Sequence, residues 1–134
     1  MPKRTLILTV VATIAVFSIS GCDKGPINPS QNITENLSGM IPMGGFDVKF
    51  FNVGKSGELV ITVVSLSPQS VFVTVIFGNA ISGQCTPTGL SASLTRTQQL
   101  PVGRILPGSY CIIVADQGFL TVNSETYVLS VSHP

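Results

Sequence analysis

The sequence is poor in charge and contains no tryptophan. Charged residues make up 10% of its 134 residues, and the formal net charge is +1 at pH 7. In soluble domains, charged residues usually make up about a quarter of the chain. The few cations are scattered rather than gathered into a basic stripe, which argues against a nucleic acid as partner. The polar surface must therefore consist mainly of serine, threonine, asparagine and glutamine.

The sequence also lacks a catalytic constellation. Its one histidine, His133, lies beside the C-terminus, where we expect a side chain to be held too poorly for catalysis. Hydrolysis needs a nucleophile beside a base, or two carboxyl groups with separated pKa values. Serines are plentiful, but no Gly-x-Ser-x-Gly motif occurs among them. We therefore predict that the protein is not an enzyme.

The N-terminus has the three-part layout of a secretory signal. Lys3 and Arg4 precede an apolar run over residues 5–19, and small residues follow. This run of about 15 residues is short for a membrane-spanning helix, which needs roughly 20. The layout predicts that residues 1–21 are removed as a signal peptide. The alternative is an uncleaved N-terminal anchor helix.

The segment Ile19-Ser20-Gly21-Cys22 resembles the lipobox of bacterial lipoproteins. In that family the chain is cut before the cysteine, which then carries two or three acyl chains such as palmitate. The resemblance implies lipidation of Cys22, membrane lipid as a partner, and a location in the bacterial cell envelope outside the cytoplasm. Two or more acyl chains anchor a protein stably. Asp23 favours the inner membrane in some lineages only, so the choice of membrane stays open.

The other two cysteines are predicted to pair. Once Cys22 is committed to lipid, Cys85 and Cys111 remain as an even pair in an oxidising compartment. A disulfide would close a loop of about 25 residues and stabilise the fold by roughly 3 kcal/mol. The alternative is two buried free thiols. A metal site is disfavoured, because two thiols and one terminal histidine make a poor ligand set.

The mature chain is expected to contain a tether and one domain. Removing the signal leaves about 113 residues, which supports a single core. Residues 22–45 are rich in proline and small polar residues and predict a lipidated, flexible tether. Met40, Ile41 and Met43 are apolar enough to dock on the domain as a first, irregular strand. The domain itself is predicted over residues 46–134.

Within this domain the pattern is one of short strands separated by turns. Apolar residues alternate with polar ones, which is typical of strands with one buried face. The predicted strands cover residues 48–53, 58–66, 71–77, 109–115 and 126–131. The predicted turns lie at residues 54–57, 67–70, 78–79 and 107–108. Residues 90–102 predict one more strand, at a sheet edge. The pattern predicts an all-β, antiparallel β-sandwich.

Four segments carry a second family resemblance. They are residues 47–53, 57–63, 106–114 and 125–131. Together they resemble the bacterial pre-peptidase C-terminal domain, a jelly-roll-like β-sandwich appended to secreted proteases and related in fold to clostridial collagen-binding domains. The resemblance covers about residues 45–131. It implies a binding or accessory role rather than catalysis.

The same resemblance bears on calcium. Related domains often have acidic residues at the start of the first strand, and Asp47 matches such a position. Two facts argue against a calcium site. Lys49 stands where a second acidic residue is common, and calcium needs roughly six to eight oxygen ligands. Asp47 is therefore a weak calcium candidate, and its alternative role is to cap a turn. We predict no other cofactor or metal.

Two further sites follow from turn chemistry. The turn at Pro107-Gly108 precedes Tyr110, which we expect to enter the core with its hydroxyl near solvent. The loop from Asp116 to Phe119 is a candidate binding site, because loops on rigid sheets commonly bind ligands. In the alternative, Phe119 folds back over the edge of the sandwich.

The sequence thus predicts a non-catalytic, membrane-anchored binding or accessory lipoprotein with a polypeptide or glycan ligand. One alternative is a purely structural envelope lipoprotein, and another is a small secreted hydrolase or inhibitor. A binding module should expose an apolar patch of roughly several hundred Å², whereas a spacer should not.

Overall fold

The computed structural model describes residues 31–69 and 71–134. The predicted signal peptide, Cys22 and the first part of the tether lie outside these residues. The eight strands are β1 (Ile33–Pro42), β2 (Phe46–Val53), β3 (Gly57–Ser67), β4 (Val73–Ile81), β5 (Gln84–Leu94), β6 (Gln99–Ile105), β7 (Gly108–Ala115) and β8 (Ser124–His133). No helix among the described residues has the length and hydropathy to cross a membrane.

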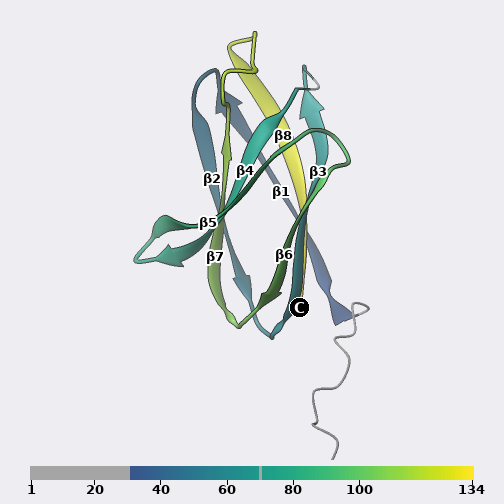
Figure 1. Cartoon of the computed structure of the whole chain (residues 1–134), viewed down its shortest axis with the longest axis vertical. Coiled ribbons are helices and arrows are strands. Elements are labelled where there is room, and N and C mark those ends of the chain that lie inside the picture. Colours follow the sequence, from purple (N-terminus) through teal and green to yellow (C-terminus); the bar gives the residue numbers. More distant parts are fainter. Residues whose placement is uncertain (1–30, 70) are drawn as a thin grey trace, which may run out of the picture.

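The strands form two four-stranded antiparallel sheets that pack face to face (Figure 1). The first sheet has the order β1-β8-β3-β6, and the second has the order β2-β7-β4-β5. Each strand pairs with neighbours from distant parts of the chain, except in the β4–β5 hairpin. This is the strand order of an eight-stranded jelly roll. The predicted fold class, an all-β jelly-roll-like sandwich, is confirmed.

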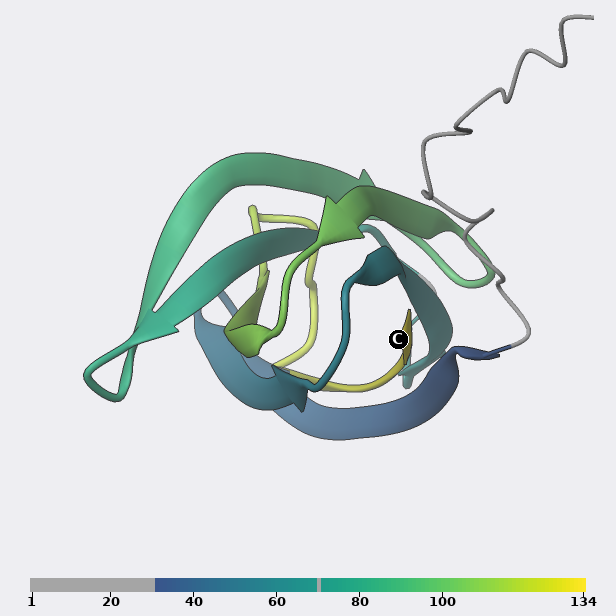
Figure 2. The ribbon, with the colours of Figure 1, turned by 90° about the horizontal axis from the view of Figure 1, so that it is seen from below.

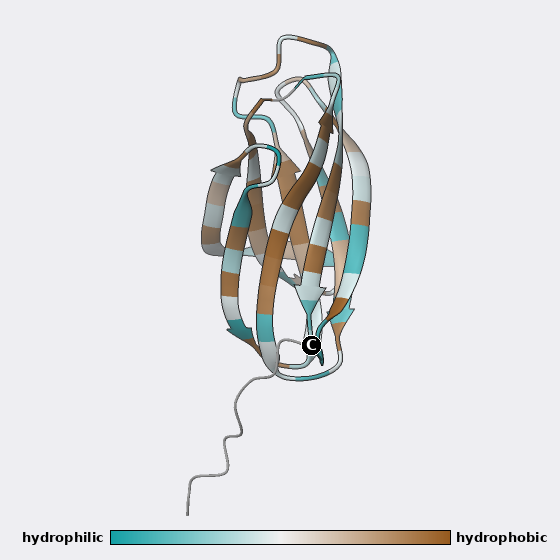
Figure 3. Ribbon diagram, turned by 90° about the vertical axis from the view of Figure 1, so that its right-hand side faces the viewer, coloured by the Kyte–Doolittle hydropathy of each residue, from teal (hydrophilic) through white to brown (hydrophobic). Residues whose placement is uncertain are grey.

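The core lies between the sheets and is built from alternate residues of the central strands. Three consecutive inward positions of β3, at Leu59, Ile61 and Val63, are fully buried. The neighbouring strand β8 adds Leu129 and Val131, which are directly opposite Val63 and Ile61 in the register and are also fully buried. The strands that face the viewer in Figure 3 accordingly alternate between hydrophobic and more polar residues. The period of two predicted from the sequence is thus the period of the buried face.

The prediction of a tether up to residue 45 is wrong for residues 33–42. These residues form β1, which pairs along its whole length with β8, from Ile33 opposite His133 to Pro42 opposite Ser124. The expected first strand at Met40, Ile41 and Met43 is confirmed for Met40 and Ile41, whereas Met43 lies in the turn after β1. The earlier residues escape detection because Leu37 is the only apolar residue at the inward positions between Glu35 and Gly39. The folded domain therefore begins at β1.

Two other predictions fail in the middle of the chain. Residues 84–105 contain two edge strands, β5 and β6, rather than one. Gly78-Asn79 is not a turn but lies inside β4, beside a bulge in its pairing with β5. The chain instead reverses at Ser82-Gly83, where φ is positive at both residues, as a two-residue hairpin turn requires. This hairpin projects to one side of the sandwich (Figure 2).

The two ends of the sandwich differ in what they carry. Ile33 and His133 face each other in the register, so the chain enters β1 beside the C-terminus (Figure 1). We call this the proximal end. The distal end carries the β1–β2 turn, the β3–β4 loop and the β7–β8 loop. The candidate loop predicted from the sequence, Asp116 to Phe119, lies at this distal end.

Candidate functional site

Asp116 joins two of the distal loops. Its Oδ1 accepts hydrogen bonds from the backbone N–H groups of residues 118, 119 and 120, at 2.8–3.1 Å. Its Oδ2 accepts another from Gly44 in the β1–β2 turn, at 2.8 Å. Burial of the carboxylate raises its pKa, but these four amides outweigh that effect and leave the pKa of Asp116 below its usual value. Asp116 is 7% exposed, so this residue shapes the loops rather than contacting a ligand directly.

Gln69 joins the third loop to the same assembly. Its side-chain amide donates to Thr121 Oγ1 at 2.6 Å and accepts from the Thr121 backbone N–H at 3.1 Å. Its own backbone N–H donates to the carboxylate of Glu125, which is fully buried. The β3–β4 and β7–β8 loops are therefore bound to each other. A connected set of loops of this kind is pre-organised, which lowers the ordering cost of binding.

Three large apolar side chains project from these connected loops. Met43 is 56% exposed, Phe72 is 44% exposed and Phe119 is 46% exposed. The rings of Phe72 and Phe119 lie 5.9 Å apart at a tilt of 58°. We call these three residues the distal loop surface. Hydrophobic segments are visible in the upper loops of Figure 3.

The sequence predicted Asp116 and Phe119 as binding residues and missed Met43 and Phe72. Phe119 is at an exposed tip, and it contacts Phe72 instead of folding away from solvent. A signal for the missed residues was present, since Met43 precedes the Gly44-Gly45 pair and Phe72 ends a turn. An apolar residue beside a turn is ambiguous in sequence, because it fits a strand start equally well.

Asp47 lies in a polar cluster between the sheets. Its Oδ2 accepts a hydrogen bond from the Tyr127 hydroxyl at 2.8 Å and lies 3.2 Å from the Lys49 ammonium. Burial raises the pKa of Asp47, but the bonds from Tyr127 and Lys49 outweigh it and lower the pKa overall. Burial and the adjacent Asp47 raise the pKa of Tyr127 well above its usual value. Gly39 makes room for this cluster, since a Cβ there would overlap Asp47.

Asp47 thus has an ammonium and a phenol as partners. In residues 31–69 and 71–134 no three side chains of the His, Cys, Asp or Glu type gather as a metal site would require. The residues present do not fit calcium, because the Asp47 carboxylate that the ion would need is paired with the Lys49 ammonium. The cluster instead links β2 of the second sheet to β8 of the first.

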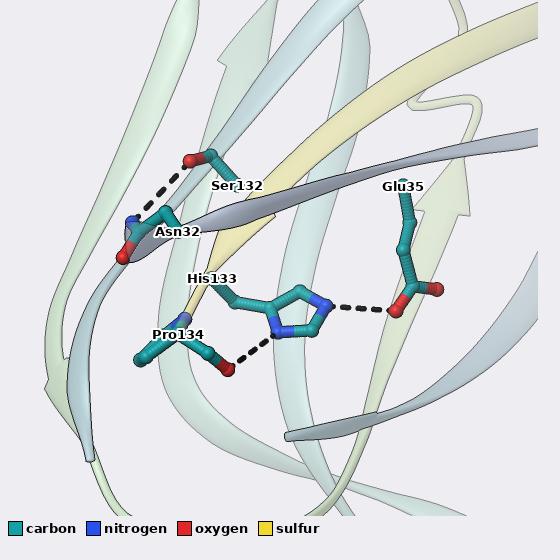
Figure 4. A network of polar contacts seen from close by, with 5 residues as sticks. All are labelled: Asn32, Glu35, Ser132, His133 and Pro134. Carbon is teal, nitrogen blue, oxygen red and sulfur yellow. Dashed lines mark hydrogen bonds and ion pairs between the residues drawn. The ribbon is translucent and has the colours of Figure 1, made fainter. Parts of the chain in front are cut away.

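His133 is held firmly, contrary to the expectation for a terminal residue. It is fully buried, and its Nε2 lies 2.8 Å from Glu35 Oε1 in β1 (Figure 4). Its Nδ1 lies 3.2 Å from the backbone oxygen of Pro134. Asn32 continues the network by donating to Ser132 Oγ. These contacts fasten the first strand to the last one at the proximal end.

The predicted disulfide between Cys85 and Cys111 is confirmed. Cys111 in β7 is directly opposite Gly78 in β4. Cys85 lies in β5, the strand on the other side of β4. The bond therefore passes over Gly78, where a Cβ would lie within 2.9 Å of both sulfur atoms. It fastens the hairpin to β7 close to the Ser82-Gly83 turn, since Cys85 pairs with Ala80 one position from the end of the hairpin. Such a bond persists in oxidising compartments outside the cytoplasm.

Tyr110 is structural, as the sequence predicted. Its hydroxyl donates to the backbone oxygen of Leu106 at 2.6 Å. Its ring stacks on Phe77, with the centroids 5.4 Å apart, and contacts Phe51 at 6.0 Å. The tyrosine therefore fixes the β6–β7 turn against the core.

The fold and the disulfide define an extracytoplasmic jelly-roll sandwich. Among solved structures, the chain is similar to the Yersinia pseudotuberculosis-derived mitogen (YPM), with a TM-score of 0.54 and 14% sequence identity. The similarity covers 77% of this chain and 87% of the mitogen chain. At this identity it shows a common sandwich fold. No protein-family model and no curated protein match the chain, so the resemblance to the pre-peptidase C-terminal domain has no support beyond the sandwich itself.

Proposed function

We propose that this protein is a non-catalytic, lipid-anchored binding module of the bacterial cell envelope. In this proposal, acylated Cys22 holds the chain on a membrane, and the distal loop surface binds a polypeptide ligand. The observation that carries the proposal is the exposure of Met43, Phe72 and Phe119 on loops that Asp116 and Gln69 bind together. Exposed aromatic side chains on a rigid support are common anchors of protein interfaces.

The position of the surface supports the same function. β1 starts at the proximal end, whereas the three apolar residues are at the opposite end of the strands. A chain anchored through Cys22 would therefore hold its binding loops away from the membrane. Lipidated Cys22, the membrane partner and the polypeptide ligand are all part of this proposal, with a glycan as the alternative ligand.

The test is affinity capture with membranes from the native cells. Wild-type protein should enrich one or a few envelope proteins, and the double variant Phe72→Ser and Phe119→Ser should lose them by at least tenfold. The matched control is Val64→Ser, which removes an exposed apolar side chain from the first sheet and should leave capture unchanged. Equal capture by all three forms would contradict the assignment of the surface. Retention by a polysaccharide panel instead would replace the polypeptide by the glycan.

A further inference from the structure

The outer faces of the two sheets differ in polarity. The outward residues of the central strand β8, in the first sheet, are serine and threonine except for Val128. Its neighbour β1 presents Thr34, Asn36 and Ser38 outward, and β3 and β6 place Glu58 opposite Arg104. Met40 and Val64 are also exposed on this sheet. Its outward apolar residues are separated by polar ones, since Met40 is opposite Thr126 and Val128 is opposite Ser38 and Ser65. This is the ordinary pattern of a sheet with one buried and one solvated face.

The outer face of the second sheet has an apolar patch on β2, β7 and β4, beside which β5 presents Ser91 and Ser93. The outward positions of β2 carry Phe46, Val48 and Phe50, of which the two phenylalanines are 64% and 48% exposed. Ile113 of β7 and Ile76 of β4 also point outward and are partly exposed. We call these five residues the outer apolar face. A contiguous apolar patch of a few hundred Å² is the largest that a soluble domain usually exposes, and such a patch is often an interaction site.

The register shows that these side chains are contiguous. Val48 is directly opposite Ile113, and Ile113 is directly opposite Ile76, so three branched residues form a row across three strands. Phe46 and Phe50 flank this row at the adjacent outward positions of β2. The Cys85–Cys111 disulfide lies beside Phe50, since Phe50 is opposite Cys111.

The outer apolar face carries no charge. The sequences of β4, β5 and β7 contain no charged residue. The two charged residues of β2, Asp47 and Lys49, occupy the alternate positions and contact each other and Tyr127. A face without charge meets an identical face without electrostatic repulsion, whereas a charged patch would repel its own copy.

We propose that the outer apolar face binds a second copy of this chain in a two-fold dimer. In an isologous dimer the same patch serves both partners, and two sheets packed face to face can bury their outward rows as in a sandwich core. The strands run along the long axis of the molecule, with the start of β1 at one end (Figure 1). A two-fold axis parallel to the strands therefore places both N-terminal segments at the same end.

This geometry agrees with attachment of both copies to one membrane, and in this respect the inference rests on the proposed lipid anchor. The three strands that carry the face, spaced about 4.8 Å apart and about six residues long, cover on the order of 300 Å². A standard interface buries about 800 Å² on each partner. The face alone is thus sized for a weak dimer, and confinement to a membrane raises the effective concentration that a weak dimer needs.

The test is disulfide trapping in the full-length chain in its native membrane. Ile113 lies in a central strand of the second sheet, so Ile113→Cys should place the two new thiols near the two-fold axis. We expect a covalent dimer that contains only this chain, at several times the yield of the control. The matched control is Val128→Cys, which alters a partly exposed residue on the outer face of the other central strand, β8. Melting temperatures equal to that of the wild type verify that both variants fold.

Any of three other trapping results would contradict the proposed dimer. Equal trapping at positions 113 and 128 would indicate random collision, and no trapping at position 113 would leave the face without a second copy. A covalent adduct with a different protein would assign the face to a heterologous partner. Fractionation of the same cells reports the anchor separately: if the protein is found in the soluble fraction, the lipid anchor fails, whereas trapping measures the dimer. Capture through Phe72 and Phe119 is a third, independent readout.

Discussion

At the scale of single residues, buried polar side chains do most of the positioning in this protein. Asp116, Gln69 and Glu125 connect the distal loops, while Asp47 and His133 connect strands of the sandwich. None of the buried polar side-chain atoms described lacks a hydrogen-bond partner. Because the carboxylates of Asp116 and Glu125 are buried and accept backbone hydrogen bonds, the removal of either should have a measurable effect on stability.

Asp116→Asn should destabilise the protein in a pH-dependent manner. The folded state lowers the pKa of Asp116, so the unfolded chain takes up a proton at higher pH than the folded chain. The stabilisation is therefore complete above the unfolded value of about 3.9 and is lost as the pH falls through the lower folded value. Near pH 7, Asp116→Asn should cost about 1–3 kcal/mol.

Urea denaturation at pH 7 and near pH 2 measures this difference. The gap in free energy of unfolding between wild type and Asp116→Asn should shrink at the lower pH. Gln117→Ala, next to it but exposed, should behave as the wild type at both values. A gap that is independent of pH would show that the charge of Asp116 is irrelevant.

Gly78 is a second residue with a specific requirement. Gly78→Ala would place a Cβ within 2.9 Å of both disulfide sulfur atoms and 2.7 Å from the backbone oxygen of Thr86. Overpacking of this kind costs about 1–3 kcal/mol, which thermal denaturation detects. Gly54→Ala is the control, because a Cβ there meets nothing within 4 Å. If the two variants have the same melting temperature, the sulfur atoms do not constrain β4.

At the scale of elements, the fold depends on a first strand whose inward positions mix polar and apolar residues. β1 places Glu35 against His133 and Gly39 against Asp47 and Tyr127, and it buries Ile41 fully in the core. Its contribution to stability therefore comes from pairing with β8, from specific polar contacts and from the burial of Ile41. A strand of this kind has little apolar alternation for sequence reasoning to detect.

The strand makes a direct prediction about fragments. A chain that starts at residue 46 should fail to fold, because β8 would lose its ten-residue partner and His133 would lose Glu35. A chain that starts at residue 31 should give a dispersed amide NMR spectrum. A folded fragment 46–134 would contradict the role assigned to β1.

The sequence predicted the elements in which side-chain periodicity and burial coincide. Strands β3, β7 and β8 were found because their inward residues are continuously apolar. The first half of β5 was missed because Pro87 and Gly89 interrupt the pattern, whereas its inward residues Leu90 and Leu94 fall within the edge strand predicted over residues 90–102. Gly78 was interpreted as part of a turn. The reason for a glycine at this position is the disulfide that crosses it, and a local sequence pattern does not reveal a contact between distant strands.

The candidate site was predicted only in part for a similar reason. The loop from Asp116 to Phe119 stands out locally, because an aspartate begins a turn that ends in an exposed aromatic residue. Met43 and Phe72 join it through the hydrogen bonds of Gly44 and Gln69, which link loops that are far apart in sequence. Local patterns do not contain such long-range contacts.

At the scale of the whole molecule, the sandwich has two unlike ends and two unlike faces. The chain enters at the proximal end, the distal end carries the exposed loop residues, and one outer face has an apolar patch. The proposed anchor at Cys22 would relate these features to a membrane. It would orient the distal loop surface away from the membrane, and it would hold the two copies of the proposed dimer side by side, with their outer apolar faces parallel to the membrane normal.

The most direct measurement of this account is the intact mass of the protein purified from native membranes. We predict a polypeptide that starts at Cys22 and carries the added mass of two or three acyl chains. The substitution Cys22→Ser should abolish the added mass and release the protein from the membrane. A chain that begins at Met1 with an unmodified Cys22 would contradict the account.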